Sequence, residues 1–121
     1  MNRTILLIED KPALTDTLKT LLELHEFNVL TASNGEEGVA HARQHHPDLV
    51  ISDIFMPVIN GYELLEIFKK DSQLRNIPVL MLTAKTAIEE INLAMKKGAA
   101  GYVTKPFLFR NLHATITKLI L

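Results

Sequence analysis

Four apolar runs in this 121-residue chain end in polar residues of the types that bind metal ions and phosphoryl groups. The endings are, in chain order, Glu9-Asp10, Asp53, Thr83 and Lys105. Three carboxylates packed together repel one another, and one ammonium among them leaves about two negative charges uncompensated. A hard divalent cation would neutralise that remainder, and magnesium suits a site of a few carboxylate oxygens, a backbone carbonyl and water. If these endings meet in space, they therefore predict a magnesium site.

Asp53 is the candidate nucleophile of such a site. A carboxylate can attack a phosphoryl group and form an aspartyl-phosphate. The hydroxyl of Thr83 can donate a hydrogen bond to one phosphoryl oxygen, and the ammonium of Lys105 can pair with another. Catalysis would then consist mainly of positioning and charge neutralisation, as expected for phosphoryl transfer. Any one of these residues alone is more simply a solvated strand end, and only their combination favours a function.

The elements that must position these residues are short apolar runs rich in valine and isoleucine, which are typical of buried parallel strands. We predict strands over residues 4–8, 28–32, 49–52, 79–82 and 102–104. Helices are predicted between and after them, over about residues 12–25, 36–45, 62–70, 87–97 and 108–121. This alternation predicts an α/β fold with right-handed crossovers and helices on both faces of one doubly wound parallel sheet.

The order of the strands decides whether the polar endings meet. We choose the order 2-1-3-4-5, which places the first strand beside the third. In an open parallel sheet, functional groups gather at the carboxyl ends of the strands. Glu9 and Asp10 should therefore lie against Asp53, with Thr83 and Lys105 at the same edge.

The composition limits the possible functions. With 13 basic and 14 acidic residues and a net charge of −1, the chain lacks the basic excess of nucleic-acid-binding proteins. The pairs Lys69-Lys70 and Lys96-Lys97 are each too short to form a polybasic patch. The absence of cysteine excludes disulfides and thiol chemistry.

Neither a membrane span nor a secretory signal is predicted. No apolar run is long enough to span a bilayer, and Met-Asn-Arg-Thr leads directly into the first strand. A length of 121 residues suffices for one domain with a real core. We therefore expect one domain over residues 1–121, located in the cytoplasm.

Several motifs together resemble the receiver domain of two-component response regulators. They are Ile8-Glu9-Asp10, Asp53-Ile54-Phe55-Met56-Pro57 with Asn60-Gly61, Thr83-Ala84, and Tyr102-Val103-Thr104-Lys105-Pro106-Phe107. Each motif alone is weak, but their order and spacing are highly specific, and the match covers the whole chain. The resemblance implies a flavodoxin-like (βα)5 fold. It also implies a magnesium-dependent phosphoacceptor that receives a phosphoryl group on Asp53 from a histidine kinase or histidine phosphotransfer protein.

The same resemblance implies roles for individual residues. The implied magnesium ligands, direct or through water, are Glu9, Asp10, Asp53 and the carbonyl of Phe55. Thr83 and Tyr102 would form a switch pair, and Lys105 would contact the phosphoryl group. Such a chain is a signalling phosphoacceptor that promotes its own phosphorylation and dephosphorylation. Its output would pass to a downstream protein or a fused output domain, without direct binding to nucleic acid or membrane.

The chain departs from the common pattern of this family at three positions near the site. Many receiver domains have an aspartate where Glu9 stands, and the longer glutamate could shift the metal geometry. Many have an acidic residue where Asn60 stands. Lys85 lies two residues after Thr83, near the mouth of the predicted site, where it could affect the lifetime of the acyl phosphate.

The chain also departs from the family pattern at positions that affect dimer formation. In the winged-helix branch of the family, activated receivers dimerise through ion pairs that use two aspartates before the strand-five aromatic residue and a later glutamate. Ala100-Gly101 and Asn111 occupy those positions here. Without these carboxylates, copies would face each other with like charges, so we expect the chain to stay largely monomeric.

Three other functional classes remain open. An aspartate-nucleophile phosphatase usually has a second aspartate two residues after the first, where this chain has Phe55. A flavodoxin needs a phosphate loop rich in serine, threonine and glycine, where this chain has Glu9-Asp10-Lys11-Pro12. An interaction module that works without phosphorylation would lack some of the acidic residues or the lysine. The intact mass after treatment with a small phosphodonor and magnesium distinguishes these classes.

Overall fold

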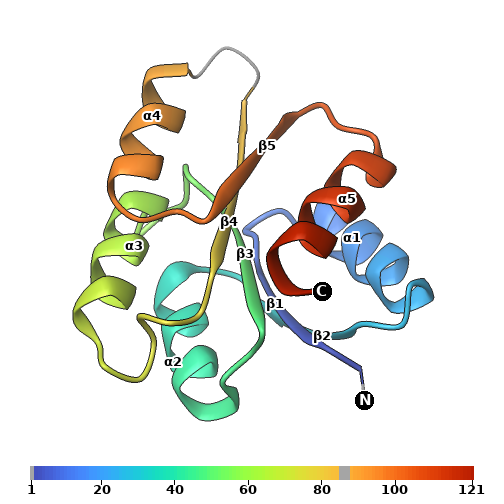
Figure 1. Ribbon diagram of the computed structural model, residues 1–121, viewed down its shortest axis with the longest axis horizontal. Helices are drawn as coiled ribbons and strands as arrows, with labels where there is room; N and C mark the ends of the chain where they lie inside the picture. The colour runs from blue at the N-terminus through green and yellow to red at the C-terminus, as the bar shows by residue number, and fades with distance from the viewer. Residues whose placement is uncertain (1, 85–87) are drawn as a thin grey trace.

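Five strands and five helices alternate along the chain in the computed structural model, which describes residues 2–84 and 88–121 (Figure 1). The strands are β1 (Thr4–Ile8), β2 (Asn28–Ala32), β3 (Leu49–Asp53), β4 (Val79–Ala84) and β5 (Gly101–Lys105). The helices are α1 (Pro12–Leu24), α2 (Gly35–His45), α3 (Gly61–Lys70), α4 (Ile88–Lys96) and α5 (Phe109–Ile120). The predicted elements are confirmed, with ends that shift by no more than two residues. The predicted start of α4 at residue 87 lies outside the described residues.

The strands form one parallel sheet in the order β2-β1-β3-β4-β5, which confirms the predicted topology. Ile8, the last residue of β1, pairs with Ser52, so the next residues of both strands emerge side by side. On the other side of β3, Asp53 pairs with Leu82 of β4. Lys105 ends β5 opposite Ala84. The register therefore carries all four polar endings to one edge of the sheet.

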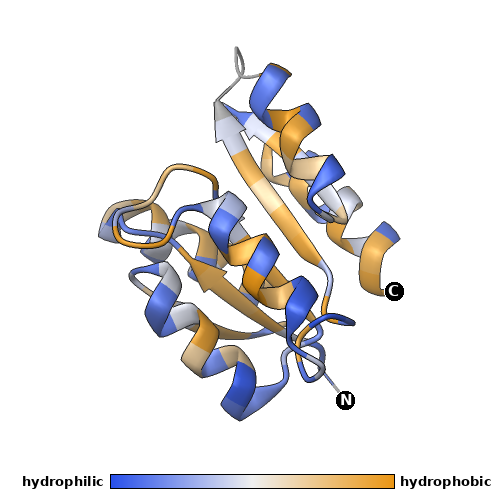
Figure 2. Ribbon diagram, turned by 90° about the vertical axis from the view of Figure 1, so that its left-hand side faces the viewer, coloured by the Kyte–Doolittle hydropathy of each residue, from blue (hydrophilic) through white to orange (hydrophobic). Residues whose placement is uncertain are grey.

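Helices cover both faces of the sheet, with α1 and α5 on one side and α2, α3 and α4 on the other (Figure 1). Alternate residues of β1 enter different core layers: Leu6 and Ile8 face the α2–α4 side, and Ile5 and Leu7 face the α1–α5 side. All four are fully buried. Because both faces are covered, the central strands show no polar alternation. Figure 2 shows apolar strands next to helices that carry both hydrophilic and hydrophobic residues.

The loop between β3 and α3 is held close to the end of β3. The Asn60 side chain accepts a hydrogen bond from the Glu63 amide at 2.9 Å, and the Glu63 carboxylate accepts one from the Asn60 amide at 3.0 Å. This capping box begins α3 immediately after the loop. A Cβ on Gly61 would lie 2.7 Å from the Cα of Ile54, so only glycine allows the helix to start this close to the strand end. The departure at Asn60 therefore serves a helix cap.

Two further features of the helices match their sequence signals. Pro12 begins α1 at the position where its missing N–H is not needed. The side chain of Asn34 accepts a hydrogen bond from the Glu37 amide at 2.8 Å and caps α2. Within the described ranges, every helix is too short or too polar to cross a membrane.

Candidate functional site

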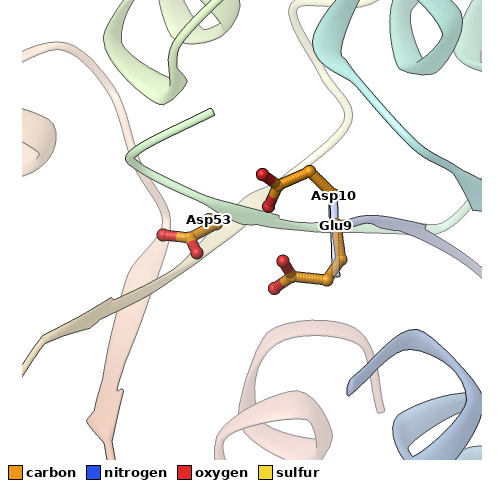
Figure 3. Close-up of side chains that lie close together, drawn as sticks. All are labelled: Glu9, Asp10 and Asp53. Atoms are coloured by element: carbon orange, nitrogen blue, oxygen red, sulfur yellow. The ribbon is translucent and has the colours of Figure 1, made fainter. Parts of the chain in front are cut away.

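The three predicted carboxylates lie together at the carboxyl edge of the sheet. Glu9, Asp10 and Asp53 each offer a carboxylate oxygen, and these oxygens all lie within 4.8 Å of one another (Figure 3). Glu9 and Asp10 directly follow β1, and Asp53 ends the neighbouring β3. Glu9 is 2% exposed and Asp53 is 6% exposed, whereas Asp10 is open to solvent. The geometry gives a half-enclosed acidic site with one open side.

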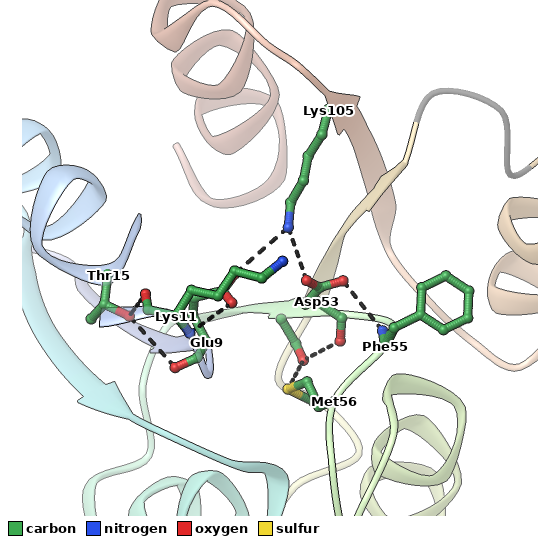
Figure 4. A network of polar contacts seen from close by, with 8 residues as sticks. Glu9, Lys11, Thr15, Asp53, Phe55, Met56 and Lys105 are labelled. Carbon is green, nitrogen blue, oxygen red and sulfur yellow. Dashed lines mark hydrogen bonds and ion pairs between the residues drawn. The ribbon is translucent and has the colours of Figure 1, made fainter. Parts of the chain in front are cut away.

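Lys105 joins this site from β5, and its peptide bond to Pro106 is cis. Its Nζ lies 2.8 Å from Oδ2 of Asp53 and 3.6 Å from Oε1 of Glu9 (Figure 4). The lysine side chain is 25% exposed, so its ammonium is partly shielded from water. One ammonium beside three carboxylates leaves an excess of negative charge, as the sequence predicted.

Hydrogen bonds orient the buried carboxylates (Figure 4). Oδ1 of Asp53 accepts a hydrogen bond from the Phe55 amide at 3.2 Å, while Oδ2 faces Lys105. Oε2 of Glu9 accepts a hydrogen bond from the Lys11 amide at 3.2 Å. The hydroxyl of Ser52 donates to the backbone carbonyl of Asp53 at 3.0 Å. These contacts hold the Asp53 carboxylate from both sides and support the loop that follows it.

Two buried oxygens of the predicted site residues have no hydrogen-bond partner among the described residues. They are Oε1 of Glu9, whose distance to Lys105 is too long for a hydrogen bond, and Oγ1 of Thr83. An unmade hydrogen bond of a buried polar group costs about 1–3 kcal/mol. A cation beside Glu9 and an acceptor oxygen beside Thr83 would supply the missing partners. The site therefore suits the binding of a metal ion and an anionic group.

The pKa of Glu9 fits the same interpretation. Burial raises it above the usual value, and the nearby carboxyls of Asp10 and Asp53 act in the same direction. The ammonium of Lys105 and the Lys11 amide oppose that shift without cancelling it. A divalent cation would reverse this balance, because it stabilises the ionised form.

Thr83 and Tyr102 lie on neighbouring strands at different depths. Thr83 of β4 is fully buried and pairs with Thr104, and Tyr102 of β5 pairs with Met81. Side chains two residues apart on a strand point to the same face. Met81 packs in the core layer on the α3–α4 side, so the Tyr102 and Thr83 side chains emerge on that face. Tyr102 is 46% exposed because β5 is an edge strand.

Four further residues were either predicted from the sequence to bear on the site or missed by it. The Phe55 amide donates a hydrogen bond to the Asp53 carboxylate, and the residue is 56% exposed. The metal-ligand role of its carbonyl stays a prediction. Lys85 lies outside the described residues. Sequence reasoning missed the support from Ser52, since a strand serine carries no positional signal. It also missed the cap at Asn60, although an Asn-x-x-Glu spacing before an apolar run was there to be read.

Comparisons with known proteins agree with this geometry. Residues 5–117 match the family model of the response regulator receiver domain. The chain is 38% identical over 116 residues to Protein PilH of Pseudomonas aeruginosa, with 96% of each chain covered. It is 33% identical over 120 residues to the alkaline phosphatase synthesis transcriptional regulatory protein PhoP of Bacillus subtilis, covering 99% of this chain and 49% of that protein. It thus spans about half the length of several curated relatives.

The fold has a close counterpart among solved structures. The chemotaxis protein CheY4 of Vibrio cholerae superposes with a TM-score of 0.91 at 30% sequence identity, covering 98% of this chain and 99% of that one. The flavodoxin-like topology implied by the motifs is therefore confirmed. The family model matches residues 5–117, and the match to Protein PilH covers 96% of both chains. The chain therefore belongs to the response regulator receiver domains of two-component signalling.

Proposed function

We propose that this chain accepts a phosphoryl group on Asp53, in a magnesium-dependent step, from a histidine kinase or a histidine phosphotransfer protein. One observation carries the proposal: the buried Asp53 carboxylate lies 2.8 Å from the Lys105 ammonium, and its oxygens converge with those of Glu9 and Asp10 within 4.8 Å. Membership of the receiver family supports phosphorelay signalling as the general function.

Asp53 is the nucleophile in this proposal. One of its carboxylate oxygens attacks the phosphorus of a phosphohistidine. A phosphorus–oxygen bond forms as the phosphorus–nitrogen bond breaks, and the departing imidazole nitrogen keeps the electron pair and takes a proton from solvent. The hydrogen bond from the Phe55 amide fixes one carboxylate oxygen and leaves the other to react.

Glu9, Asp10 and Asp53, with the carbonyl of Phe55, are the proposed ligands of magnesium. When bound, the ion would offset the charge of the carboxylates and hold a phosphoryl oxygen. The residues fit this role because their oxygens converge within 4.8 Å and Oε1 of Glu9 is buried without a hydrogen-bond partner among the described residues. Oxygen donors of this kind are those that magnesium prefers.

Lys105 and Thr83 would receive the new phosphoryl group. Lys105 can move from Oδ2 of Asp53 to a phosphoryl oxygen without leaving the site, since it already bridges two carboxylates. The Thr83 hydroxyl, buried beside the site, can donate a hydrogen bond to a second phosphoryl oxygen. Movement of Thr83 would then open space for Tyr102 and switch the surface around β5. The signal would pass to a downstream protein or a fused output domain, and we expect both partners to be met in the cytoplasm.

A small phosphodonor and intact mass spectrometry test this function. In the presence of magnesium, the wild-type chain should gain the mass of one phosphoryl group, and Asp53→Asn should gain none. Asp48→Asn is the matched control, because Asp48 lies just before β3, at the opposite end of the strand from Asp53. An adduct on Asp53→Asn, or full phosphorylation in excess chelator, would contradict the proposal. A persistent adduct also separates a phosphoacceptor from a phosphatase.

A further inference from the structure

Two lysine pairs that are separate in the sequence lie together where α3 and α4 end. Lys69-Lys70 ends α3, and Lys96-Lys97 ends α4 and begins the following turn. All four line one surface groove of about 500 Å³ with Glu66. The two helices lie side by side in Figure 1 and contact each other. Each pair is too short to be a basic patch, but the fold joins them into one.

A smaller groove of about 160 Å³ continues this surface, because Lys69 and Lys97 line both. It adds Arg75 from the connection between α3 and β4. We define the α3–α4 basic groove by the charged residues of both parts, which are Glu66, Lys69, Lys70, Arg75, Lys96 and Lys97. The groove thus holds five of the 13 basic residues of the chain and one of its 14 acidic residues. Positive charge is concentrated here in a chain whose net charge is −1.

The acidic groups nearby do not neutralise this surface. Glu66 forms an ion pair with Lys97, and the lysines hold its pKa below the usual value, first through Lys97 and then through Lys70. Asp71, which follows α3, pairs instead with Arg43 of α2 at 3.0 Å. Four cationic side chains of the groove therefore have no ion-pair partner within the described part of the chain.

The groove lies at the edge of the domain opposite the phosphoacceptor site. Asp53 lies where β3 ends, whereas α3 and α4 run back against the strands and end at the other edge. A ligand in the groove would not compete with a phosphodonor at Asp53. Binding in the groove would therefore be a function separate from the proposed phosphoryl transfer.

We propose that the α3–α4 basic groove binds an acidic segment of a partner protein. Charge complementarity carries this inference, because clustered lysines attract carboxylates and steer their approach. Nucleic acid fits less well. Its binding typically uses aromatic rings as stacking platforms and arginine for base contacts. The aromatic residue that lines the groove, Phe68, is 3% exposed, and Arg75 is the single arginine among the lining residues.

A titration followed by amide NMR shifts tests the proposal. The probe is a short polyglutamate peptide, added to the full 15N-labelled chain. We expect the largest shifts at residues 66–70, 75 and 96–98. Reversing two exposed lysines in Lys70→Glu/Lys96→Glu should weaken binding about tenfold, since each reversal removes one attraction and adds one repulsion. Lys19→Glu/Lys118→Glu, with the same net charge but altered outside the groove, should bind like the wild type.

Three results would overturn the proposal. They are an absence of shifts at the groove, equal weakening in the two double variants, and tighter binding of an oligothymidylate of equal charge at the same amides. The last result would assign the groove to nucleic acid. If Lys70→Glu/Lys96→Glu fails to fold, the milder Lys70→Gln/Lys96→Gln takes its place and should weaken binding by a smaller factor.

Discussion

The ammonium of Lys105 lies 2.8 Å from Oδ2 of Asp53 and ties the edge strand β5 to β3, two strands away in the sheet. The 3.6 Å contact with Oε1 of Glu9 extends this link to β1. A single side chain thus connects three strands through charges that phosphorylation and metal binding would both alter. If Asp53 is phosphorylated as proposed, Lys105 is the side chain through which the change would reach the outer strand.

Lys105→Gln should slow phosphorylation of Asp53 by a small molecule about 100-fold. Removal of one preorganised charged donor from a site where charge develops typically costs a factor of about 10²–10³. The rate of mass gain under saturating magnesium measures the effect. Lys19→Gln changes a half-exposed lysine of α1 that pairs with Glu23, and this variant should react at the wild-type rate. Equal rates for all three chains would show that Lys105 takes no part.

Glu9→Gln should weaken magnesium binding, and Asp10→Asn should weaken it more, because aspartate has the shorter reach to the ion. Both variants should fold, since loss of one negative charge relieves repulsion among Glu9, Asp10 and Asp53 in the metal-free state. Calorimetric titration with magnesium checks the order. Unchanged affinity in both variants would remove these residues from the ligand set.

The raised pKa of Glu9 predicts how metal-free stability depends on pH. The folded chain keeps the Glu9 proton to a higher pH than the unfolded chain, whose glutamate titrates near its usual value of 4.5. Between the two pKa values the folded state binds more protons, so the free energy of unfolding falls as pH rises. The loss of stability caused by ionising the buried Glu9 is complete once the pH exceeds the raised pKa of the folded state. Below the usual glutamate pKa, Glu9 is protonated in both the folded and the unfolded state, and this loss of stability disappears.

Glu9→Gln removes this titration. In chelator, the variant should gain stability over the wild type as pH rises from about 4 to about 8, because only the wild type acquires a buried charge over that range. Urea unfolding at several pH values measures the difference. A stability difference that does not change with pH would show that the Glu9 pKa is not raised. In saturating magnesium the wild type should instead be more stable than Glu9→Gln, since the ion stabilises the ionised carboxylate.

The switch between Thr83 and Tyr102 should depend on the Thr83 hydroxyl. Thr83→Ala should still accept a phosphoryl group on Asp53 but lose the coupled change of Tyr102. In the proposed switch, the exposed Tyr102 side chain moves inward as the buried Thr83 is drawn away, and the two states should differ by a few kcal/mol at most. Ring NMR shifts of Tyr102 with and without phosphorylation report the coupling. An equal response in Thr83→Ala would disprove it.

The sequence predicted the location of the site better than its detailed contacts. Strand order and polar strand ends sufficed to bring Glu9 and Asp10 to Asp53, because parallel strands end at one edge. The bridge from Lys105 to two carboxylates depends on side-chain reach, which a motif does not specify. Contacts of the Ser52 hydroxyl depend on its exact depth in the sheet, which no residue pattern encodes.

Surface properties were harder still to predict. The two lysine pairs looked unimportant in the sequence because they are 26 residues or more apart in the chain, and only the packing of α3 against α4 brings them together. The same packing pairs Lys97 with Glu66 of α3, an ion pair between residues 31 positions apart that no local pattern predicts. Asn60 looked like a missing acidic residue until its helix cap was seen.

The surface formed by α4, β5 and α5 leads to the last prediction, that activation leaves the chain largely monomeric. Ala100, Gly101 and Asn111 supply no carboxylate there, while Lys96 and Arg110 are exposed. Two copies related by a two-fold axis would bring these cations together. Exposed apolar side chains on the same surface, including Leu93, Met95 and Tyr102, suit a different partner protein. The beryllofluoride-bound chain should therefore sediment as a monomer at micromolar concentration.

Restoring the missing carboxylates provides the matched test of this explanation. Ala100→Asp/Gly101→Asp/Asn111→Glu should raise the sedimentation coefficient of the activated chain, because each new carboxylate can pair with a cation across the axis. Gly101 has room for a Cβ, which would lie at an ordinary contact distance of 3.5 Å from Cδ1 of Leu80. A tight dimer of the unmodified chain through this surface, lost in Asp53→Asn, would refute the prediction. A triple variant that stays monomeric would show that absent ion pairs are not what prevents the dimer.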